Sequence, residues 1–374
     1  MTHIVFIHLL NDFSGSPMVL NETIRAAKSQ GLHTTLYIGS DGNGILSSND
    51  VCQKKYWYRR TPYKILTFLT YTLSQIILFF RLIGDSEIPK NAIIYVNTLL
   101  PYGAALYGKL TKRKVIYHIH EVSITPKPLK WFLTYICRKT SSFNIYVSNT
   151  HQKSLPILGI PSQKVYNTLK ADFWNSANRF TYKHKLNGIF HILMIASLRD
   201  YKGIAELFKL AKNLSSHSDI QLTLVVNDDQ TSIDAYCKNK EYLANLSIYP
   251  RVSDTSPFYQ KANLVLNLSR VDQWEETFGM TILEAITYGI PCIVPPIGGP
   301  AEIINNGIEG FHIDSRDHQE LFEKVLLIYN DDNLVYKLSK NARKRSTAFT
   351  PENFSHEICS IITQLSKVIQ PNEI

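Results

Sequence analysis

The feature that most constrains the fold is a regular alternation of strand-like and helix-like segments along the whole chain. Apolar runs typical of buried strands occur at residues 3–9, 33–39, 92–98, 114–120 and 143–149, and helical segments separate them. A polar stretch follows residue 171, and a second series then runs from FHILMIAS to IPCIVP. Such alternation predicts parallel sheets. We therefore expect an α/β protein with two doubly wound, Rossmann-like domains, at residues 1–178 and 185–350.

In doubly wound domains, ligands bind beyond the carboxyl ends of the strands. Two such domains that face each other would share a cleft there. A chain of 374 residues with 44% hydrophobic and 19% charged residues is consistent with two soluble domains. The first residues enter a strand-like run without the features of a signal peptide. The five cysteines are widely spaced and show no metal-binding or disulfide pattern, which favours a reducing, cytoplasmic location.

The charge is unevenly distributed. Residues 1–180 contain 21 Lys and Arg against 8 Asp and Glu, whereas the remaining residues contain 19 against 23. The densest basic run is KKYWYRRTPYK at residues 54–64, where cations alternate with aromatic residues. This composition suits an anionic membrane surface, and a solvated basic loop is the equal alternative. The apolar segment at 64–84 is uncharged only over 65–80, which is short for a membrane span and favours a buried or membrane-apposed helix.

Two acidic residues surround a glycine in the stretch EETFGMTILE. Gly279 precedes a short helix that is expected to end near Tyr288, and the free N–H groups at the helix start would attract a phosphate. Glu284 lies on the side of this helix opposite the apolar residues, where its carboxylate could bind a vicinal diol such as a ribose. Taken alone, Glu276 and Glu284 would each by default be solvated surface residues.

Two histidines alternate in the strand YHIHEV, so His118 and His120 are expected to face the same side. His118 lies deeper in the strand and suits a hydrogen-bonded core position, whereas His120 lies at the carboxyl end. We expect no metal site, since no third ligand lies nearby and no Asp-x-Asp motif occurs.

The run EETFGMTILEAITYGIPCIVPPIGGPAEII resembles the signature of the family 4 retaining glycosyltransferases of the GT-B fold. The matching positions have fixed offsets and are Glu276, Phe278, Gly279, Glu284, Gly289, Pro291, Gly298, Gly299 and Glu302. The segment IASLRDYKG resembles the Lys-Gly motif of the family at Lys202, and Arg199 stands two residues after Ser197, where the family usually has Arg. The segment HLLNDFSGSP resembles its phosphate loop, with Gly15-Ser16 where Gly-Gly is common.

The resemblance implies roles for these residues. Lys202 and Arg199 would bind the donor diphosphate, and Glu276 would bind hydroxyls of the donor sugar, helped by the N–H groups of Phe278 to Met280. His120 would contact the transferred sugar near the reacting centre. The N–H groups of the loop at Gly15 and Ser16 would also face the phosphates. The loop at Arg251 and Val252 would lie near the donor base, and a terminal helix at 352–374 would pack back on the first domain.

The activity implied is metal-independent transfer of a hexose-type sugar from a nucleoside-diphosphate sugar, with the anomeric configuration retained. The basic first domain favours a lipid-diphosphate-linked saccharide as acceptor at the inner face of the cytoplasmic membrane, in synthesis of a bacterial surface polysaccharide such as O-antigen lipopolysaccharide or capsule. A nucleoside-diphosphate-sugar epimerase and a non-catalytic nucleotide-sugar binder remain as alternatives on the same fold. A nucleic-acid partner is not expected, since the sequence has no recognised binding module despite its pI of about 9.1.

Overall fold

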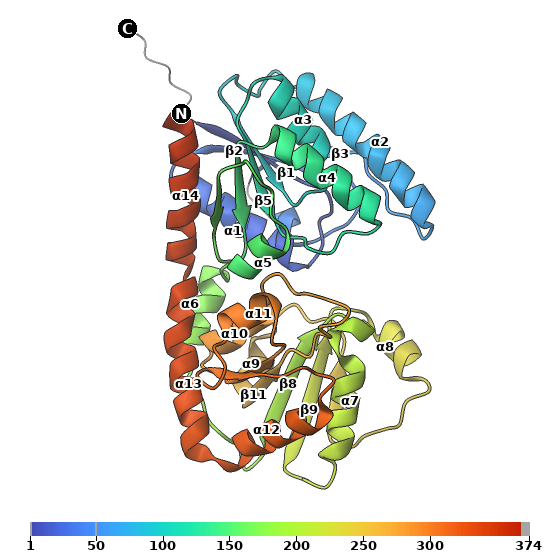
Figure 1. Cartoon of the computed structure of the whole chain (residues 1–374), viewed down its shortest axis with the longest axis vertical. Helices are drawn as coiled ribbons and strands as arrows, with labels where there is room; N and C mark the ends of the chain where they lie inside the picture. The colour runs from blue at the N-terminus through green and yellow to red at the C-terminus, as the bar shows by residue number, and fades with distance from the viewer. Residues whose placement is uncertain (1, 49–50, 368–374) are drawn as a thin grey trace. The chain divides into compact units, whose positions relative to one another are not determined.

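The computed structural model describes residues 2–48 and 51–367, which form two compact units. Unit 1 comprises Met1–Thr168 and Pro351–Ile374, and unit 2 comprises Leu169–Thr350. Each unit contains one parallel sheet covered by helices (Figure 1). The expectation of two doubly wound α/β domains is confirmed.

The sheet of unit 1 has seven parallel strands in the order β3-β2-β1-β4-β5-β6-β7. The strands are β1 (His3–His8), β2 (His33–Gly39), β3 (Cys52–Tyr56), β4 (Ile93–Asn97), β5 (Val115–Ile119), β6 (Phe143–Tyr146) and β7 (Ser162–Lys164). The central strands are buried on both faces, because helices cover the sheet on each side, and their sequences are therefore continuous apolar runs.

The helices of unit 1 form two layers (Figure 1). On one side α1 (Gly15–Ser29) packs against α14 (Pro351–Lys367), the described part of the helix expected at 352–374. On the other side α3 (Tyr102–Leu110) packs between α2 (Lys64–Ile83) and α4 (Lys127–Thr140). A single turn, α5 (Asn149–Ser154), follows β6 and is capped by the Ser148 hydroxyl, which accepts the N–H of His151 at 3.0 Å.

The sheet of unit 2 has six parallel strands in the order β10-β9-β8-β11-β12-β13. They are β8 (Phe190–Ala196), β9 (Ile220–Val226), β10 (Leu246–Tyr249), β11 (Leu264–Leu266), β12 (Cys292–Val294) and β13 (Gly310–His312). The helices of this unit are α6 (Ala171–Arg179), α7 (Ile204–Asn213), α8 (Gln230–Cys237), α9 (Ser256–Lys261), α10 (Met280–Thr287), α11 (Gly298–Ile303), α12 (His318–Asn330) and α13 (Asp332–Ser346).

In each sheet the strand order reverses once, between β1 and β4 in unit 1 and between β8 and β11 in unit 2. The carboxyl ends of strands beside such a reversal are where doubly wound sheets bind ligands. The fold therefore predicts one candidate site in each unit, after β1, β4 and β5 in the first and after β8 and β11 in the second.

The boundary between the units lies ten residues before the expected position of 178. The helix α6 belongs to unit 2, because the ring of Phe173 packs on Tyr288 with centroids 5.7 Å apart, and Arg343 Nη1 donates to the carbonyl of Ala177 at 2.9 Å. The polar composition of this stretch suggested a linker, but its apolar side chains are buried against α10.

The basic run at 54–64 is partly built into unit 1, although Lys55, Arg59, Arg60 and Lys64 are exposed. Lys54 lies in β3, the strand at the sheet edge, and its Nζ is 2.5 Å from both Asp85 Oδ2 and Glu87 Oε2. The aromatic rings of Tyr56 and Tyr58 are buried in the core of unit 1. Lys54, Tyr56 and Tyr58 are therefore structural residues of this run, and Lys54 is already neutralised.

Candidate active site

The centre of the candidate site in unit 2 is an ion pair at the reversal of the strand order. Lys202 ends a short 3-10 turn after β8, and its Nζ lies 3.2 Å from Oε2 of Glu276. The same carboxylate oxygen accepts hydrogen bonds from Asn267 Nδ2 at 2.9 Å and from Ser269 Oγ at 3.3 Å. Asn267 and Ser269 follow β11, so two neighbouring strands supply all the groups that hold Glu276.

Glu276 is an anion at neutral pH. Its burial alone would raise the pKa of the carboxyl, but the positive charge of Lys202 and the hydrogen bonds from Asn267, Lys202 and Ser269 outweigh burial and lower the pKa below its ordinary value. The contact is therefore a charged pair, held by polar side chains of unit 2.

Two glycines allow this geometry, because the loops approach one another at backbone distance. A Cβ at Gly203 would lie 2.1 Å from the carbonyl oxygen of Leu268. Glycine at this position therefore lets the Lys202 turn pack closely against the loop after β11. A Cβ at Gly299 would lie 2.2 Å from the Cα of Phe278, and the Gly299 N–H donates to the Glu276 carbonyl at 2.7 Å. The glycines of the Lys-Gly and Gly-Gly motifs therefore fix the backbone of Lys202 and Glu276.

The helix α10 begins directly after Gly279, whose φ of 101° starts the helix from a left-handed conformation. Its first N–H groups have no earlier turn to bond and give the helix start a positive partial charge. The ring of Phe278 is buried, so the expected contribution of this residue is made by the backbone alone. Phe278 and Gly279 thus lie on the same loop as Glu276, and Met280 is the first residue of α10.

Glu284 is partly buried, and the Tyr259 hydroxyl donates to its Oε2 at 2.6 Å. Burial raises the pKa of Glu284 to about 7, although the hydrogen bond from Tyr259 works in the opposite direction. Tyr259 is fully buried and stacks on Tyr288, with ring centroids 5.6 Å apart. The hydrogen bond from the buried Tyr259 therefore fixes the orientation of the Glu284 side chain. Glu284 is not the solvated residue that the sequence alone allowed.

An aromatic pair flanks the lysine. The rings of Tyr201 and Trp274 stack at 4.9 Å, and Lys202 Nζ lies 5.4 Å from the Trp274 ring centroid. This distance allows a cation–π contact. The lysine is thus oriented by a carboxylate on one side and a ring on the other.

The candidate site in unit 1 is organised by Asn97 at the end of β4. Its Nδ2 donates to the carbonyl of Ser16 at 3.1 Å and lies 3.1 Å from Nδ1 of His8, while its Oδ1 lies 2.9 Å from His120 Nε2. A carbonyl can only accept, so the amide nitrogen faces Ser16 and the amide oxygen faces the imidazole. His120 Nε2 must then carry the proton, which leaves Nδ1 as the unprotonated nitrogen of the neutral ring.

Four imidazoles gather in this region. The rings of His118 and His120 lie 4.4 Å apart, on one side of the strand as predicted, and Tyr95 OH lies 2.9 Å from Nδ1 of the buried His118. Burial lowers the pKa of His8 and His151 to about 4 and that of His118 to about 3. Burial, together with the neighbouring histidines, also lowers the pKa of His120 well below its ordinary value. The cluster is neutral at physiological pH.

Glu121 completes the cluster. Its carboxylate accepts the N–H groups of Leu99 and His120, each at 3.2 Å, and its carbonyl accepts from His151 Nε2 at 3.1 Å. Burial raises the pKa of Glu121 to about 7, although these backbone hydrogen bonds work in the opposite direction.

Some predicted residues are brought together and others are not. Lys202 contacts Glu276, and Ser16 is linked to His120 through Asn97. The Arg199 side chain is exposed to solvent. Arg251 and Val252 follow β10, two strands from β8, and the Arg251 N–H donates to the Asp228 carbonyl at 2.9 Å. Gly15 starts α1, one residue before Ser16.

The sequence prediction omitted several residues that hold the site. Asn97, Asn267 and Ser269 all lie at or just after the carboxyl end of a strand beside a reversal of strand order. The sequence signal that could have identified them is a polar residue at the carboxyl end of an apolar strand. Tyr259 gave no such signal, because it lies inside α9.

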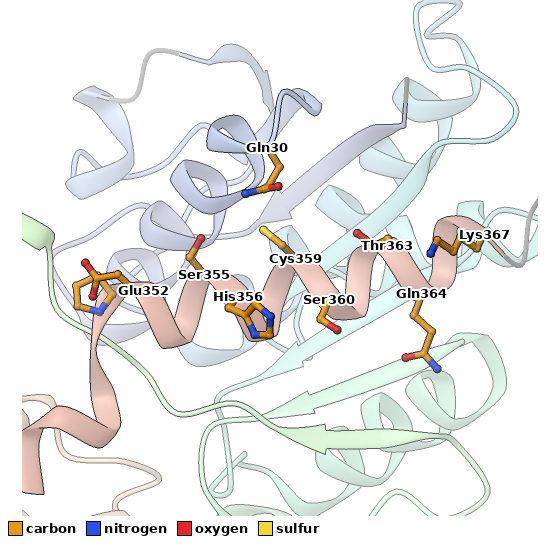
Figure 2. A pocket seen from close by; sticks show the side chains of 10 residues that line it. Gln30, Glu352, Ser355, His356, Cys359, Ser360, Thr363, Gln364 and Lys367 are labelled. Atoms are coloured by element: carbon orange, nitrogen blue, oxygen red, sulfur yellow. The ribbon is translucent and has the colours of Figure 1, made fainter.

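The described residues contain no group of three or more His, Cys, Asp or Glu side chains placed to hold a metal ion. A shallow groove of unit 1 lies along α14 and reaches Gln30 at the end of α1 (Figure 2). Cys359 faces α1 there, and its Sγ lies 3.4 Å from the Ala26 carbonyl. The residues that line this groove do not include any of the predicted site residues.

Comparison with known proteins gives matches in sequence and in fold. A family model described as "Glycosyl transferases group 1" matches residues 179–345. CapM of Staphylococcus aureus, a capsular polysaccharide biosynthesis glycosyltransferase, is 26% identical over 300 residues, which cover 73% of this chain and 74% of CapM. A sucrose synthase of Melioribacter roseus is 49% identical over 76 residues, which cover 19% of this chain and only 10% of that protein.

Among solved structures, Anabaena HepE in complex with UDP-glucose has a TM-score of 0.78 at 17% identity, covering 97% of this chain and 99% of HepE. Identity this low shows a shared fold. The family model covers the ion pair, the Gly-Gly turn and α10, which are the parts that the sequence motif had singled out. The fold, the match of residues 179–345 to the family model and the similarity to CapM agree that this chain is a glycosyltransferase with a group 1 domain.

Proposed function

We propose that the chain transfers a hexose-type sugar from a nucleoside-diphosphate sugar to a lipid-linked saccharide, with retention of the anomeric configuration, in the synthesis of a bacterial surface polysaccharide such as capsule or O-antigen lipopolysaccharide. The observation that carries the proposal is the contact between Lys202 and Glu276 beside the start of α10. A cation and a set of helix N–H groups suit a diphosphate, and a fixed carboxylate suits sugar hydroxyls. The names of CapM and of the HepE complex support the donor and the pathway class.

In the proposed reaction, the bond between the anomeric carbon and the diphosphate oxygen breaks as a bond to the acceptor oxygen forms on the same face. The acceptor hydroxyl proton passes to the departing phosphate oxygen. Lys202, Arg199 and the N–H groups at the start of α10 stabilise the charge that develops on the diphosphate, each donor being worth about 2–4 kcal/mol of barrier. Glu276 binds hydroxyls of the donor sugar, and Glu284, held by Tyr259, binds the ribose diol.

We propose that no resident metal ion is required, because these cationic groups face the leaving charge. Activity in the presence of EDTA checks this point: turnover should persist at the level seen with added Mg²⁺. A loss of turnover that Mg²⁺ alone restores contradicts it.

We further propose that the chain works at the inner face of the cytoplasmic membrane as a peripheral protein, since a lipid-linked acceptor is presented there. The cationic and apolar surfaces of unit 1 support this location.

A thermal-shift screen over nucleoside diphosphates and their sugars tests the donor. A ligand at 100 times its Kd adds about 2.7 kcal/mol of stability. The variants Lys202→Ala and Glu284→Ala should lose most of that shift, whereas Lys209→Ala, at an exposed position of α7, should keep it. No shift with any nucleotide sugar contradicts the proposal.

An activity assay with and without acceptor then tests the transfer. Release of nucleoside diphosphate should require an acceptor saccharide. Conversion of the donor sugar without an acceptor indicates an epimerase instead, and binding without turnover indicates a non-catalytic binder.

A further inference from the structure

The helix α2 buries polar as well as apolar residues on its inner side and exposes apolar residues on its outer side. Its polar residues Ser74 and Gln75 are buried against the rest of unit 1, and Gln75 Oε1 accepts the N–H of Gly103 in α3 at 3.2 Å. The hydroxyl of Tyr71 donates to the Leu100 carbonyl at 2.7 Å. These bonds fix the inner side of α2, so its outer side is a defined surface of the folded unit.

The outer side of α2 carries a continuous apolar stripe. Six of its residues, from Leu66 to Ile83, are spaced three or four apart, which places them on one side of the helix, and Ile65 and Phe68 lie beside them. The stripe consists of the exposed residues Ile65, Leu66, Phe68, Leu69, Leu73, Ile76, Phe80 and Ile83. Ile65 is 79% exposed and Phe80 is 64% exposed. A contiguous apolar surface of this kind marks an interaction site.

The helix α4, which is separated from α2 by α3, also carries exposed aromatic rings. Trp131 and Tyr135 stack at 5.7 Å, and Trp131 is 69% exposed. Tyr102 of α3 makes edge-to-face contacts with Tyr71 of α2 and Phe132 of α4, with centroid distances of 5.9 and 5.2 Å. These contacts join the three helices into one layer (Figure 1). Exposed Trp and Tyr side chains are typical of the headgroup region of a bilayer.

The charges on these two helices have a single sign. Neither α2 nor α4 contains an acidic residue. Their cations lie near the helix ends and are Lys64, Arg81, Lys127, Lys130, Arg138 and Lys139. An apolar stripe bordered by cations complements an anionic bilayer, where apolar side chains enter the acyl boundary and Lys and Arg remain at the headgroups.

A second copy of this chain is the competing occupant, because Leu66, Leu69, Leu73, Ile76, Phe80 and Ile83 follow the spacing of a coiled-coil seam. Such a seam is normally flanked by charges of both signs that pair across it. Pairing α2 with another α2 would instead bring cations together without an acidic residue on either helix to neutralise them. The charge pattern therefore favours the bilayer.

We propose that the exposed stripe of α2, together with Trp131 and Tyr135 of α4, docks unit 1 on an anionic phospholipid bilayer, with α2 parallel to the membrane plane. By length and composition α2 could also cross a membrane, but its inner side is hydrogen-bonded within unit 1. The inference rests on the proposed function, since it supplies the contact through which a lipid-linked acceptor is reached. It moves the docking surface from the basic run at 54–64 to α2 and α4.

Flotation of the full chain with phosphatidylcholine vesicles, with and without phosphatidylglycerol, tests the proposal. The wild type should float with the anionic vesicles, and Ile76→Asp with Phe80→Asp should weaken binding at least tenfold. The matched control, Tyr242→Asp with Ile308→Asp, changes two exposed apolar residues of unit 2 and should float like the wild type. Equal flotation of the α2 variant and the wild type, or no flotation of the wild type, overturns the proposal.

Two further measurements separate the remaining outcomes. Lipids brominated in the acyl chain should quench part of the tryptophan fluorescence, and Trp131→Phe should remove that part. Sedimentation velocity tests for a second copy of the chain. If the wild type forms a dimer, the α2 variant does not, and the wild type does not bind vesicles, the stripe is a dimer contact and the proposal is overturned.

The nucleotide thermal shift of the α2 variant should equal that of the wild type. A wild type that shows this shift but ignores vesicles rejects the membrane surface and leaves the proposed donor chemistry standing.

Discussion

At the carboxyl ends of their central strands, unit 1 gathers neutral imidazoles around an amide, and unit 2 gathers a charged pair. The difference arises from which polar groups the strands supply. In unit 1 the partners of the histidines are Asn97, Tyr95 and backbone carbonyls, none of which compensates a buried positive charge. In unit 2 Lys202, Asn267 and Ser269 together stabilise the negative charge of Glu276. The same sheet topology thus supports a neutral site and an ionised one.

The largest expected difference between the two units is the loss of stability in acid. The pKa values of His8 and His151 are lowered to about 4 and that of His118 to about 3, so folded unit 1 binds fewer protons than its unfolded chain below pH 6.5. The stability from these groups is present above pH 6.5 and is lost as the pH falls toward 4. Glu121, whose pKa is raised to about 7, opposes part of the loss. We expect a net loss on the order of 3–6 kcal/mol for unit 1.

Urea unfolding at pH 7 and pH 5 checks this difference. A variant that keeps only Trp57 and Trp131 reports on unit 1, and one that keeps only Trp174 and Trp274 reports on unit 2. In unit 2 the lowered pKa of His191 and the raised pKa of Glu284 act in opposite directions, so its midpoint should change little. Equal acid responses of the two reporters would show that the contrast between the sites is wrong.

Lys202→Ala should have the largest effect on activity. Removal of a donor to the leaving diphosphate lowers turnover by about 10²–10³-fold, or about 2.7–4 kcal/mol. It also leaves Glu276 as a partly buried anion without its cation. The double variant Lys202→Ala, Glu276→Gln removes that unpaired charge and should regain stability without regaining turnover. Rates of nucleotide release and urea midpoints measure the two effects, and near wild-type turnover of Lys202→Ala contradicts the role of the ion pair.

The central strands could be predicted from sequence because they are buried on both faces and are therefore continuous apolar runs. The edge strand β3 could not, since CQKKY contains two lysines and one of its faces meets solvent. The strands β7 (SQK) and β13 (GFH) have few apolar residues and therefore show no strand pattern. The end of unit 1 was placed too late, because the apolar side of α6 is carried by few residues in a polar stretch.

The Lys202 and Glu276 positions were predicted because the motif fixes both at set offsets from glycines. Their partners were not, since Asn267 and Ser269 meet Glu276 only because the loop between β11 and α10 folds back on itself, and the sequence does not give the path of that loop. The same holds for Asn97, which reaches Ser16 and His120 because β4 lies between β1 and β5. Glu284 was placed on the correct side of α10, but its bond to Tyr259 of α9 depends on helix packing.

Asn97→Ala should lower kcat by about 10- to 100-fold, because His120 loses the group that sets its tautomer and orientation. Asn97→Asp keeps an acceptor for His120 Nε2 but adds a negative charge, which should raise the pKa of His120 and move the pH–rate profile to higher pH. The control Asn144→Ala changes another buried asparagine of unit 1 and should lower stability without moving the profile. Identical profiles for both Asn97 variants and the wild type contradict a positioning role.

The smallest effect is expected at Glu284, the one acid of the unit 2 site that resembles the neutral groups of unit 1. Burial raises its pKa to about 7, so between about pH 4.3 and pH 7 the folded chain keeps a proton that the unfolded chain has lost. Its contribution to stability therefore falls as the pH rises through this window and stays constant above it. Glu284→Gln keeps an acceptor for Tyr259 and cannot ionise.

The variant should match the wild type near pH 5 and be more stable by about 1–2 kcal/mol at pH 8. The variant should be more stable but should bind the donor more weakly, because only the ionised form of Glu284 binds a ribose diol with full strength. The loss of affinity should then be larger at pH 8 than at pH 6. Urea midpoints and nucleotide titrations at both pH values measure these changes, with Glu323→Gln on the exposed side of α12 as the control. A variant whose stability follows the wild type at both pH values would show that Glu284 ionises normally, and the site in unit 2 would then be charged throughout.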